Sequence, residues 1–329
     1  MSSWYTTHAP EDDIAVSTRI RLARNLSGLP FPARMTPEQR KELNLKVKNA
    51  VLQSNTPFAK SLKYIDMADA AMVERHIISP EFAEENADRA IIISADESIS
   101  IMIGEEDHVR IQVILGGLQL EKAYDTAEQL DSLLYNELHF AFDRNLGFLT
   151  ECPTNLGTGL RASVMLHLPV TESNGEISSI AETVGKIGFT VRGMYGEGTK
   201  ASASMYQVSN QITLGISEKN AIDNLKIITA QLIDKERKAR NGLNKIKLED
   251  MCFRALGTLQ NSRILSSKEM MDLLSRIKLG ISMGIIKTDA LPIKLFIEGQ
   301  PNMLMKKYGQ LEPEERDIYR AAFIRDALK

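Results

Sequence analysis

The chain has 329 residues, of which 43% are hydrophobic and 25% charged, as expected for a soluble globular protein with two domains or one large one. Its formal net charge of −3 gives no reason to expect direct nucleic-acid binding, and its two cysteines cannot form a disulfide framework. The N-terminus lacks a signal-peptide pattern, and no apolar run approaches the roughly 20 residues that span a bilayer. These features predict a cytoplasmic protein without a membrane segment.

The first two thirds of the chain predict helices and strands without regular alternation. A capping box at residues 36–39 opens a helix that should run to residue 52, because threonine and glutamine can each satisfy a free backbone amide. Further helices are predicted by apolar periodicity at residues 120–142, 178–186 and 218–240. Strands are predicted by runs of β-branched residues at 91–93, 98–103, 109–115, 160–168, 190–194 and 204–208.

The last third has a different composition, with no convincing strand. Its helices are predicted at residues 247–259, 266–279, 291–307 and 313–328. We therefore place a domain boundary near residues 238–246, between a domain of residues 1–240 and a helical domain of residues 241–329. The fold class predicted is α+β, with an antiparallel sheet flanked by helices and an all-helical C-terminal domain.

The familiar phosphate-binding loops are absent from the sequence. Residues 193–200 (GMYGEGTK) resemble a P-loop, but Thr199 precedes Lys200, the reverse of the order that the motif needs. No dinucleotide fingerprint follows a predicted strand, and no cluster has the spacing of a zinc site. A nucleotide would have to be bound by other means.

Five arginines stand out as candidates for that role. Arg19 and Arg21 alternate in a predicted strand, so both should lie on one face of it, and the others are Arg110, Arg161 and Arg192. A guanidinium is always charged and can bind phosphate oxygens through two parallel hydrogen bonds. Five converging arginines could hold a triphosphate and stabilise charge on a phosphoryl group in transfer. Sequence alone leaves open the alternative that they are solvated surface residues.

Four segments in order carry a more specific signal. They are residues 17–21 (STRIR), 105–110 (EEDHVR), 146–163 (LGFLTECPTNLGTGLRAS) and 191–197 (VRGMYGE). Together they closely resemble the motifs of the guanidino kinases, the ATP:guanidino phosphotransferases that include arginine and creatine kinase. The resemblance implies that the five arginines bind ATP phosphates, and that His76 stacks on the adenine. It also implies that Mg²⁺ bridges phosphate oxygens with few direct protein ligands, so no protein metal site is predicted.

The same resemblance implies catalytic roles for Glu106, Glu197 and Cys152. A guanidinium is a poor nucleophile because its lone pairs are delocalised and it is protonated at neutral pH. Two carboxylates could orient it in line with the γ-phosphorus, and one could accept its proton as the N–P bond forms. Glu106 is the stronger candidate for that base, with Glu197 in an orienting role. A Cys152 thiolate could steer the guanidinium, although a buried structural cysteine is the alternative.

Two departures separate this chain from the small-molecule guanidino kinases. About 15 residues precede the first motif, so the family's helical N-terminal domain is expected to be missing, and Met165 replaces a histidine that often contacts the nucleotide. A helical C-terminal region follows instead. This layout resembles the bacterial protein-arginine kinases (McsB type), up to residues 315–322 (ERDIYRAA). That resemblance implies phosphorylation of arginine side chains in proteins, and a phosphoarginine-binding pocket that includes Arg316 and Asp317.

The resemblance also implies partners that the residues themselves do not reveal. These are a Clp unfoldase–protease, a stress-response repressor, an activator protein and a second copy of the chain in a homodimer or higher oligomer. Marking of proteins for Clp-type degradation during stress would follow. Two alternatives remain at this stage: a kinase for a free small guanidino compound, and a non-catalytic adaptor that binds phosphoarginine. For Arg316 and Asp317 the alternative is an ordinary charge pair on a helix surface.

Overall fold

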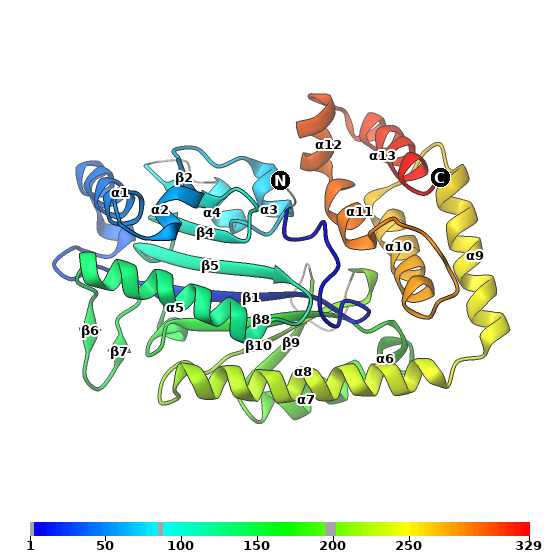
Figure 1. Ribbon diagram of the computed structural model, residues 1–329, viewed down its shortest axis with the longest axis horizontal. Coiled ribbons are helices and arrows are strands. Elements are labelled where there is room, and N and C mark those ends of the chain that lie inside the picture. The colour runs from blue at the N-terminus through cyan, green and yellow to red at the C-terminus, as the bar shows by residue number, and fades with distance from the viewer. Residues whose placement is uncertain (1–2, 85–87, 195–201) are drawn as a thin grey trace.

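The structure is a computed structural model that describes residues 3–84, 88–194 and 202–329. Its centre is an eight-stranded sheet with the strand order β2-β3-β4-β5-β1-β8-β10-β9, in which every neighbouring pair is antiparallel (Figure 1). A two-stranded ribbon, β6–β7, projects from it. The strands are β1 Ala15–Arg24, β2 Leu62–Ile65, β3 Ala90–Ser94, β4 Ile99–Ile103, β5 Val109–Gly116, β6 Phe142–Asp143, β7 Gly147–Phe148, β8 Leu160–His167, β9 Phe189–Gly193 and β10 Met205–Asn210.

Helices cover the sheet and form the whole of the C-terminal region. Those that precede residue 242 are η1 Pro32–Arg34, α1 Pro37–Leu52, α2 Pro57–Ser61, α3 Ala70–Glu74, α4 Pro80–Glu84, α5 Leu120–Glu137, η2 Pro153–Asn155, α6 Pro169–Ser173, α7 Ile177–Gly185, η3 Ser202–Ser204 and α8 Glu218–Asn241. Those that follow are α9 Lys245–Asn261, α10 Ser267–Ser282, α11 Pro292–Glu298, α12 Pro301–Tyr308 and α13 Pro313–Ala327. The predicted α+β class, with an antiparallel sheet and a helical C-terminal region, is confirmed.

Local signals placed most elements correctly, and two predicted helices were wrong in extent. At the start of α1 the side chains of Thr36 and Gln39 cap each other's backbone amides, as predicted. The helix expected over residues 120–142 ends at Glu137, because the backbone becomes extended at Leu138 and then leads into β6. The helix expected over residues 291–307 is two helices, α11 and α12. Pro301 cannot donate the amide hydrogen bond that a continuous helix would need.

The two faces of the sheet differ in character because side chains alternate along each strand. One face is apolar and is covered by α1, α5 and α8, with buried residues such as Leu22, Val113 and Val164 in the same core. Burial of each such side chain contributes roughly 1.5–3 kcal/mol, which makes this the main hydrophobic core. The other face carries the predicted arginines on its central strands, whereas toward the β2 edge Ile91 and Met102 on that face lie in a buried apolar cluster with Phe82 of α4.

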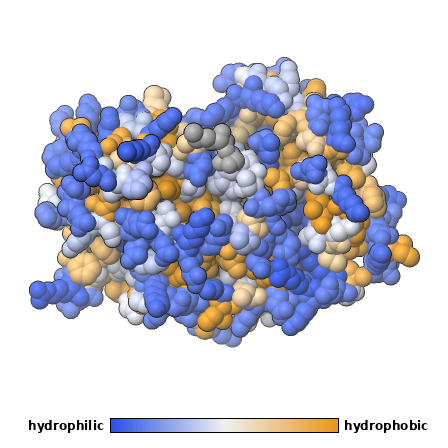
Figure 2. Space-filling model, viewed as in Figure 1, coloured by the Kyte–Doolittle hydropathy of each residue, from blue (hydrophilic) through white to orange (hydrophobic). Residues whose placement is uncertain are grey.

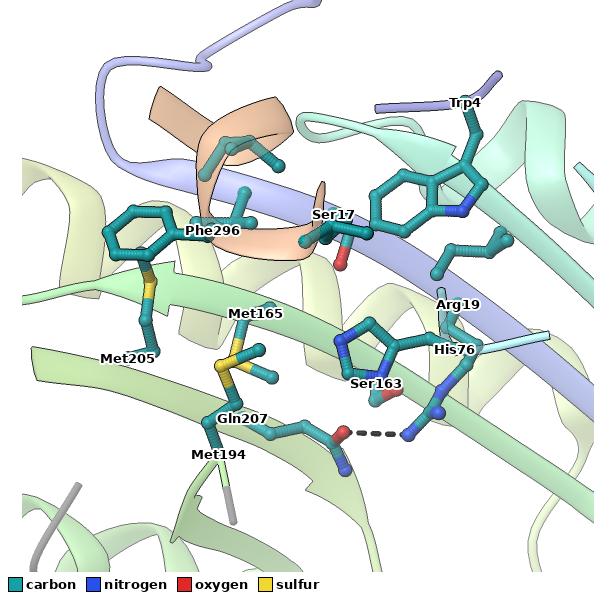
Figure 3. Close-up of a pocket in the computed structure, with 14 residues that line it drawn as sticks. Trp4, Ser17, Arg19, His76, Ser163, Met165, Met194, Met205, Gln207 and Phe296 are labelled. Carbon is teal, nitrogen blue, oxygen red and sulfur yellow. Dashed lines mark hydrogen bonds between the residues drawn. The ribbon is translucent and has the colours of Figure 1, made fainter. Parts of the chain in front are cut away.

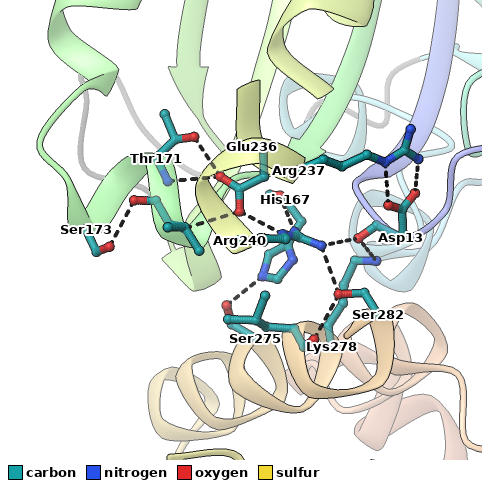
Figure 4. A network of polar contacts seen from close by, with 12 residues as sticks. Asp13, His167, Thr171, Ser173, Glu236, Arg237, Arg240, Ser275, Lys278 and Ser282 are labelled. Atoms are coloured by element: carbon teal, nitrogen blue, oxygen red, sulfur yellow. Dashed lines mark hydrogen bonds and ion pairs between the residues drawn. The ribbon is translucent and has the colours of Figure 1, made fainter. Parts of the chain in front are cut away.

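The C-terminal helices share a hydrophobic core with Val170, Ala203 and Met205 of the sheet region, and buried polar contacts also join the two parts (Figure 4). Arg240, near the end of α8, pairs with Glu236 at 2.9 Å, donates to the carbonyl of His167 on β8 at 3.1 Å, and reaches Ser282 on α10 at 2.8 Å. His167 in turn meets Ser275 on α10 at 2.8 Å. Buried charges persist only when they are paired in this way, so these contacts fix α10 against the sheet.

The surface is mostly hydrophilic. On the face drawn in Figure 2, apolar patches also reach the surface among the C-terminal helices. Ile246 and Phe253 of α9 are among the exposed apolar side chains of the chain. Among the described residues, no helix combines the length and the apolar character that crossing a membrane would require.

Candidate active site

The sheet register gathers the five predicted arginines on one face. Arg21 on β1 lies directly opposite Arg161 on β8, and Arg110 on β5 lies opposite Ala23, the next residue of β1 on that face. Arg192 on β9 lies opposite Gln207 of β10, whose side chain accepts a hydrogen bond from Arg19 at 2.7 Å. Four strands far apart in sequence therefore present guanidinium groups to a single surface.

This cluster concentrates positive charge that is only partly matched: Arg110 pairs with two carboxylates, whereas Arg21 and Arg161 form no ion pair among the described residues. The Nε atoms of Arg21 and Arg161 are buried, and within the described part of the chain neither has a hydrogen-bond partner. Burial, reinforced by repulsion from Arg161 and Arg110, lowers the pKa of Arg19 to about 10. The pKa values of Arg21 and Arg161 are lowered by the same two causes, burial first. Such a surface favours a polyanion, because bound phosphates would compensate both the charge and the unpaired donors.

Two carboxylates border the cluster, and they differ in exposure. Arg110 binds both Glu105 and Glu106, at 2.7 Å each. The Glu105 side chain is 5% exposed and also accepts a hydrogen bond from Ser79, so it is fixed in the fold. The Glu106 side chain is 41% exposed and faces the open side of the site. Glu106 is therefore the carboxylate that an incoming group can reach.

Cys152 and Glu106 line the same cavity. The cavity has a volume of about 500 Å³, and its walls include Arg21, Glu106, Arg110, Cys152 and Arg161. The Cys152 thiol lies 3.0 Å from the hydroxyl of Thr154. The amide of Asn155, in the same loop, lies 3.5 Å from Glu106. Guanidinium, thiol and carboxylate groups thus meet in one hollow. The predicted Glu197 lies outside the described residues.

A buried network that sequence reasoning missed fixes the Glu106 and Cys152 loops together. The Asp107 carboxylate accepts hydrogen bonds from the Asn25 side chain at 2.7 Å and from the Glu151 amide at 2.8 Å. Asn25 in turn accepts from the His108 amide at 2.8 Å. Asp107 and His108 stand in the 105–110 motif, which was the available signal, but nothing local linked them to Asn25, some 80 residues earlier.

Removal of the Asp107 carboxylate should therefore impair both stability and catalysis. We expect Asp107→Ala to lower the free energy of unfolding by about 2–4 kcal/mol, because it leaves buried donors unpaired. Phosphoryl transfer should fall further than the unfolded fraction explains, since the Cys152 loop loses its tether to Glu106. Asp107→Asn keeps one acceptor oxygen and should retain more of both. Denaturant unfolding and steady-state rates would measure this, and equal losses in the two variants would contradict the tether.

His76 lines a second, smaller pocket beside Arg19 (Figure 3). Its backbone has φ of 59°, a conformation that non-glycine residues rarely adopt, and the side chain of Gln112 donates to its carbonyl at 2.8 Å. Its ring centre lies 6.4 Å from that of Trp4. Burial, and to a lesser extent Arg19, lowers the pKa of His76 to about 4, so the ring is neutral at pH 7.

The depressed pKa predicts a loss of stability in mild acid. An unfolded histidine takes up a proton near pH 6.5, whereas folded His76 does so only near pH 4, so the unfolded state binds more protons within this window. Stability should therefore fall as the pH is lowered from 6.5 to 4, with a contribution from His76 of about 2–3 kcal/mol. Urea unfolding across this range would show a shallower fall for His76→Gln. The same slope in both proteins would exclude this role.

Arg316 and Asp317 lie on α13, in the C-terminal region. The Asp317 carboxylate pairs with Arg320, whose guanidinium also donates to the carbonyls of Gly299 at 2.7 Å and Leu265 at 2.8 Å. Arg316 is half-buried. The structure therefore places these two residues on a different element from the arginine face, with Asp317 already engaged by a neighbouring cation.

Comparison with known proteins covers both parts of the chain. Residues 42–239 match the family "ATP:guanido phosphotransferase, C-terminal catalytic domain", and residues 245–329 match "Protein-arginine kinase McsB C-terminal domain". The protein-arginine kinase of Caldanaerobacter subterraneus is 44% identical, over 97% of this chain and 98% of that protein. That of Clostridium kluyveri is 44% identical, over 100% of this chain and 99% of that protein.

Solved structures share the fold. A substrate-free taurocyamine kinase from Schistosoma mansoni is 27% identical, with a TM-score of 0.61 over 73% of this chain and 37% of that one. A lombricine kinase, 24% identical, shares the fold with a TM-score of 0.60 over 71% of this chain and 69% of that one. The strand register, the arginine face and these matches lead to one conclusion: the chain belongs to the protein-arginine kinases, enzymes with an ATP:guanido phosphotransferase catalytic domain.

Proposed function

We propose that this enzyme transfers the γ-phosphoryl group of ATP to a guanidinium nitrogen of arginine side chains in proteins, giving phosphoarginine and ADP. The observation that carries the proposal is the hollow in which Arg21, Arg110 and Arg161 face the exposed carboxylate of Glu106. Arg21 and Arg161, whose Nε atoms have no partner among the described residues, suit the triphosphate, and a reachable carboxylate suits the guanidinium.

The residues of the site have separate roles in an in-line transfer. The N–P bond forms as the bond between the γ-phosphorus and its bridging oxygen breaks, and the electron pair leaves with ADP. Arg19, Arg21, Arg110, Arg161 and Arg192 hold the phosphates and stabilise the charge that spreads over the moving group. Glu106 accepts the proton that the guanidinium loses and later releases it to solvent.

Glu197 and Cys152 complete the acceptor side of this proposal. Glu197 would hold the guanidinium fork opposite Glu106, so that the nucleophilic nitrogen points at phosphorus. Cys152, beside the arginine cluster, would steer the guanidinium as a thiolate and need not form a covalent intermediate. His76 would stack on the adenine, since its ring stays neutral at pH 7.

Magnesium fits this site as part of the nucleotide. Among the described residues, no three His, Cys, Asp or Glu side chains are grouped as metal ligands. The carboxylates nearest the arginines, Glu105 and Glu106, are both bound to Arg110. Mg²⁺ would therefore enter with ATP and neutralise phosphate charge, and Mg–ATP is the substrate that the arginine face receives.

Proteins, rather than free guanidino compounds, are the proposed acceptors. The relatives that match over nearly their whole length are named as protein-arginine kinases. The Glu106 side chain is 41% exposed, so an arginine presented from outside the hollow can reach its carboxylate. The alternatives are phosphorylation of free arginine, and an adaptor without catalysis.

The acceptor is identified by a direct comparison of products. The purified protein is incubated with Mg–ATP and either a disordered basic protein or free arginine, and mass spectrometry follows at neutral pH, since an N–P bond is acid-labile. Phosphate on protein arginines alone supports the proposal. Phosphorylation of free arginine alone would assign the chain to the small-molecule kinases. No transfer to either would favour the adaptor, or an enzyme that requires an activator.

The C-terminal region, residues 241–329, is proposed to recruit substrates or regulate activity. Arg316 could pair with the phosphoryl group of phosphoarginine and Asp317 with its guanidinium. In this setting Asp317 would exchange its pairing with Arg320 for the ligand. We further propose a cytoplasmic homodimer or higher oligomer that cooperates with a Clp unfoldase–protease, a stress-response repressor and an activator protein.

A further inference from the structure

The pocket beside Arg19 has a composition suited to a flat, uncharged ring system. It is continuous in the fold with the arginine face, because Arg19 and Arg21 are two residues apart on the same face of β1. Its floor includes Ser163, Met165 and Gln207. Methionine, aliphatic and aromatic side chains make up most of the lining, and Arg19, Ser163 and Gln207 add polar groups. This combination suits a nucleobase, which has apolar faces and polar edges.

One wall of this pocket comes from the C-terminal region. Ile293, Phe296 and Ile297 of α11 line it together with residues of the sheet. Figure 3 shows Phe296 toward one end of the pocket and Trp4 and His76 toward the other. Phe296 and Ile297 are each 3% exposed, and Ile297 packs in a small core with Trp4. The residues of α11 are therefore part of the pocket wall.

The position of α11 is fixed at its C-terminal end from two directions. Arg320 of α13 donates to the carbonyl of Gly299, the residue after α11. Glu74, two residues before His76, accepts from the backbone amides of Asn302 at 3.0 Å and Met303 at 2.8 Å, at the start of α12. Gly299 itself packs so closely that an added Cβ would lie 2.3 Å from the sulfur of Met270. These contacts thus fix the position of α11 relative to the His76 segment.

We propose that α11 forms one wall of the nucleotide-base site, with Ile293, Phe296 and Ile297 as base-contacting residues. This rests on the proposed use of ATP, and it gives the C-terminal region a direct part in nucleotide binding. The pocket is complete only while α11 remains packed against the sheet. Displacement of the C-terminal helices would therefore weaken ATP binding and leave the arginine face intact.

The single tryptophan of the chain makes the proposal measurable. Trp4 lines the pocket, so a bound base should change its emission. ATP should therefore alter the fluorescence of the wild-type protein. Inorganic tripolyphosphate, which offers the phosphates without a base, should bind in calorimetry with little change in emission.

Substitutions in α11 should weaken the binding of ATP without weakening that of tripolyphosphate. Phe296→Leu and Ile293→Ala are expected to raise the Kd for ATP by about five- to tenfold, the usual scale for loss of one contact with a stacked base. The Kd for tripolyphosphate should stay within about twofold of wild type, because the arginine face is untouched. Phe323→Leu and Ile285→Ala remove comparable side chains that pack on the C-terminal core outside this pocket, and should affect neither ligand.

The outcomes distinguish this inference from the proposed function. If Phe296→Leu and Ile293→Ala bind ATP as tightly as wild type, or lose ATP and tripolyphosphate equally, the inference is wrong even in an active kinase. If ATP binds with the predicted dependence on α11 but no phosphoryl group is transferred, the proposed function fails and the base site stands. A wild-type protein that binds tripolyphosphate but not ATP would overturn the inference as well.

Discussion

Substitution of Glu106 by glutamine is expected to reduce the rate of phosphoryl transfer at saturating Mg–ATP by about 10²–10⁴-fold, the range for loss of a general base. Glutamine preserves the size of the side chain and an acceptor oxygen for Arg110, but it cannot take the proton from the guanidinium. Because Glu106 does not bind the nucleotide in this account, the KM for ATP should change by no more than about threefold.

Steady-state kinetics on a protein acceptor would test this, with Glu81→Gln as the matched control. Glu81 lines the same cavity and is exposed, yet it has no role in the proposed transfer. It should retain wild-type rates within about twofold. Full activity in Glu106→Gln would remove Glu106 from the mechanism, and an equal loss in both variants would point to the general charge of the cavity.

Substitution of Arg161 by methionine is expected to have opposite effects on activity and stability. The kcat/KM should fall by about 10³-fold or more, as for other arginines that stabilise a phosphoryl group in transfer. Stability should rise by about 1 kcal/mol, because methionine removes a buried Nε that has no partner in the described structure and relieves repulsion with neighbouring arginines. ATP should also stabilise the variant less than it stabilises wild type.

Thermal unfolding with and without Mg–ATP, together with kinetics, would measure both effects. Arg144→Met is a suitable control, since Arg144 is exposed in the β6–β7 turn and contributes nothing to the arginine face. A destabilised but active Arg161→Met would show that Arg161 is structural, contrary to the role proposed for it.

How much of this site could be predicted depended on how far apart in the sequence its neighbouring residues lie. The alternation of Arg19 and Arg21 with Ile20 predicted that both would share one face, since strand geometry alone determines it. Their meeting with Arg161 needed the pairing of β1 with β8, which is set by packing of the opposite, apolar face. Ordered motifs shared with a known family supplied that information where local pattern could not.

Other features of the site could not be predicted from a single sequence. The hydrogen bond between Asn25 and Asp107 joins positions about 80 residues apart, and nothing near Asn25 marks it as a buried polar residue. The wall that α11 adds to the pocket depends on packing between the C-terminal helices and the sheet. The split between α11 and α12 was missed for a simpler reason: apolar periodicity continues across Pro301, although the helix cannot.

The central claim is that phosphorus moves from ATP to a guanidinium nitrogen. Phosphorus NMR of a neutral reaction containing the enzyme, Mg–ATP and a basic protein tests it most directly. The account predicts that the γ-phosphate signal declines as a phosphoramidate signal on the protein grows by the same amount, and that the new signal disappears in acid. Growth of inorganic phosphate alone, or of an acid-stable phosphoester signal, would contradict the account.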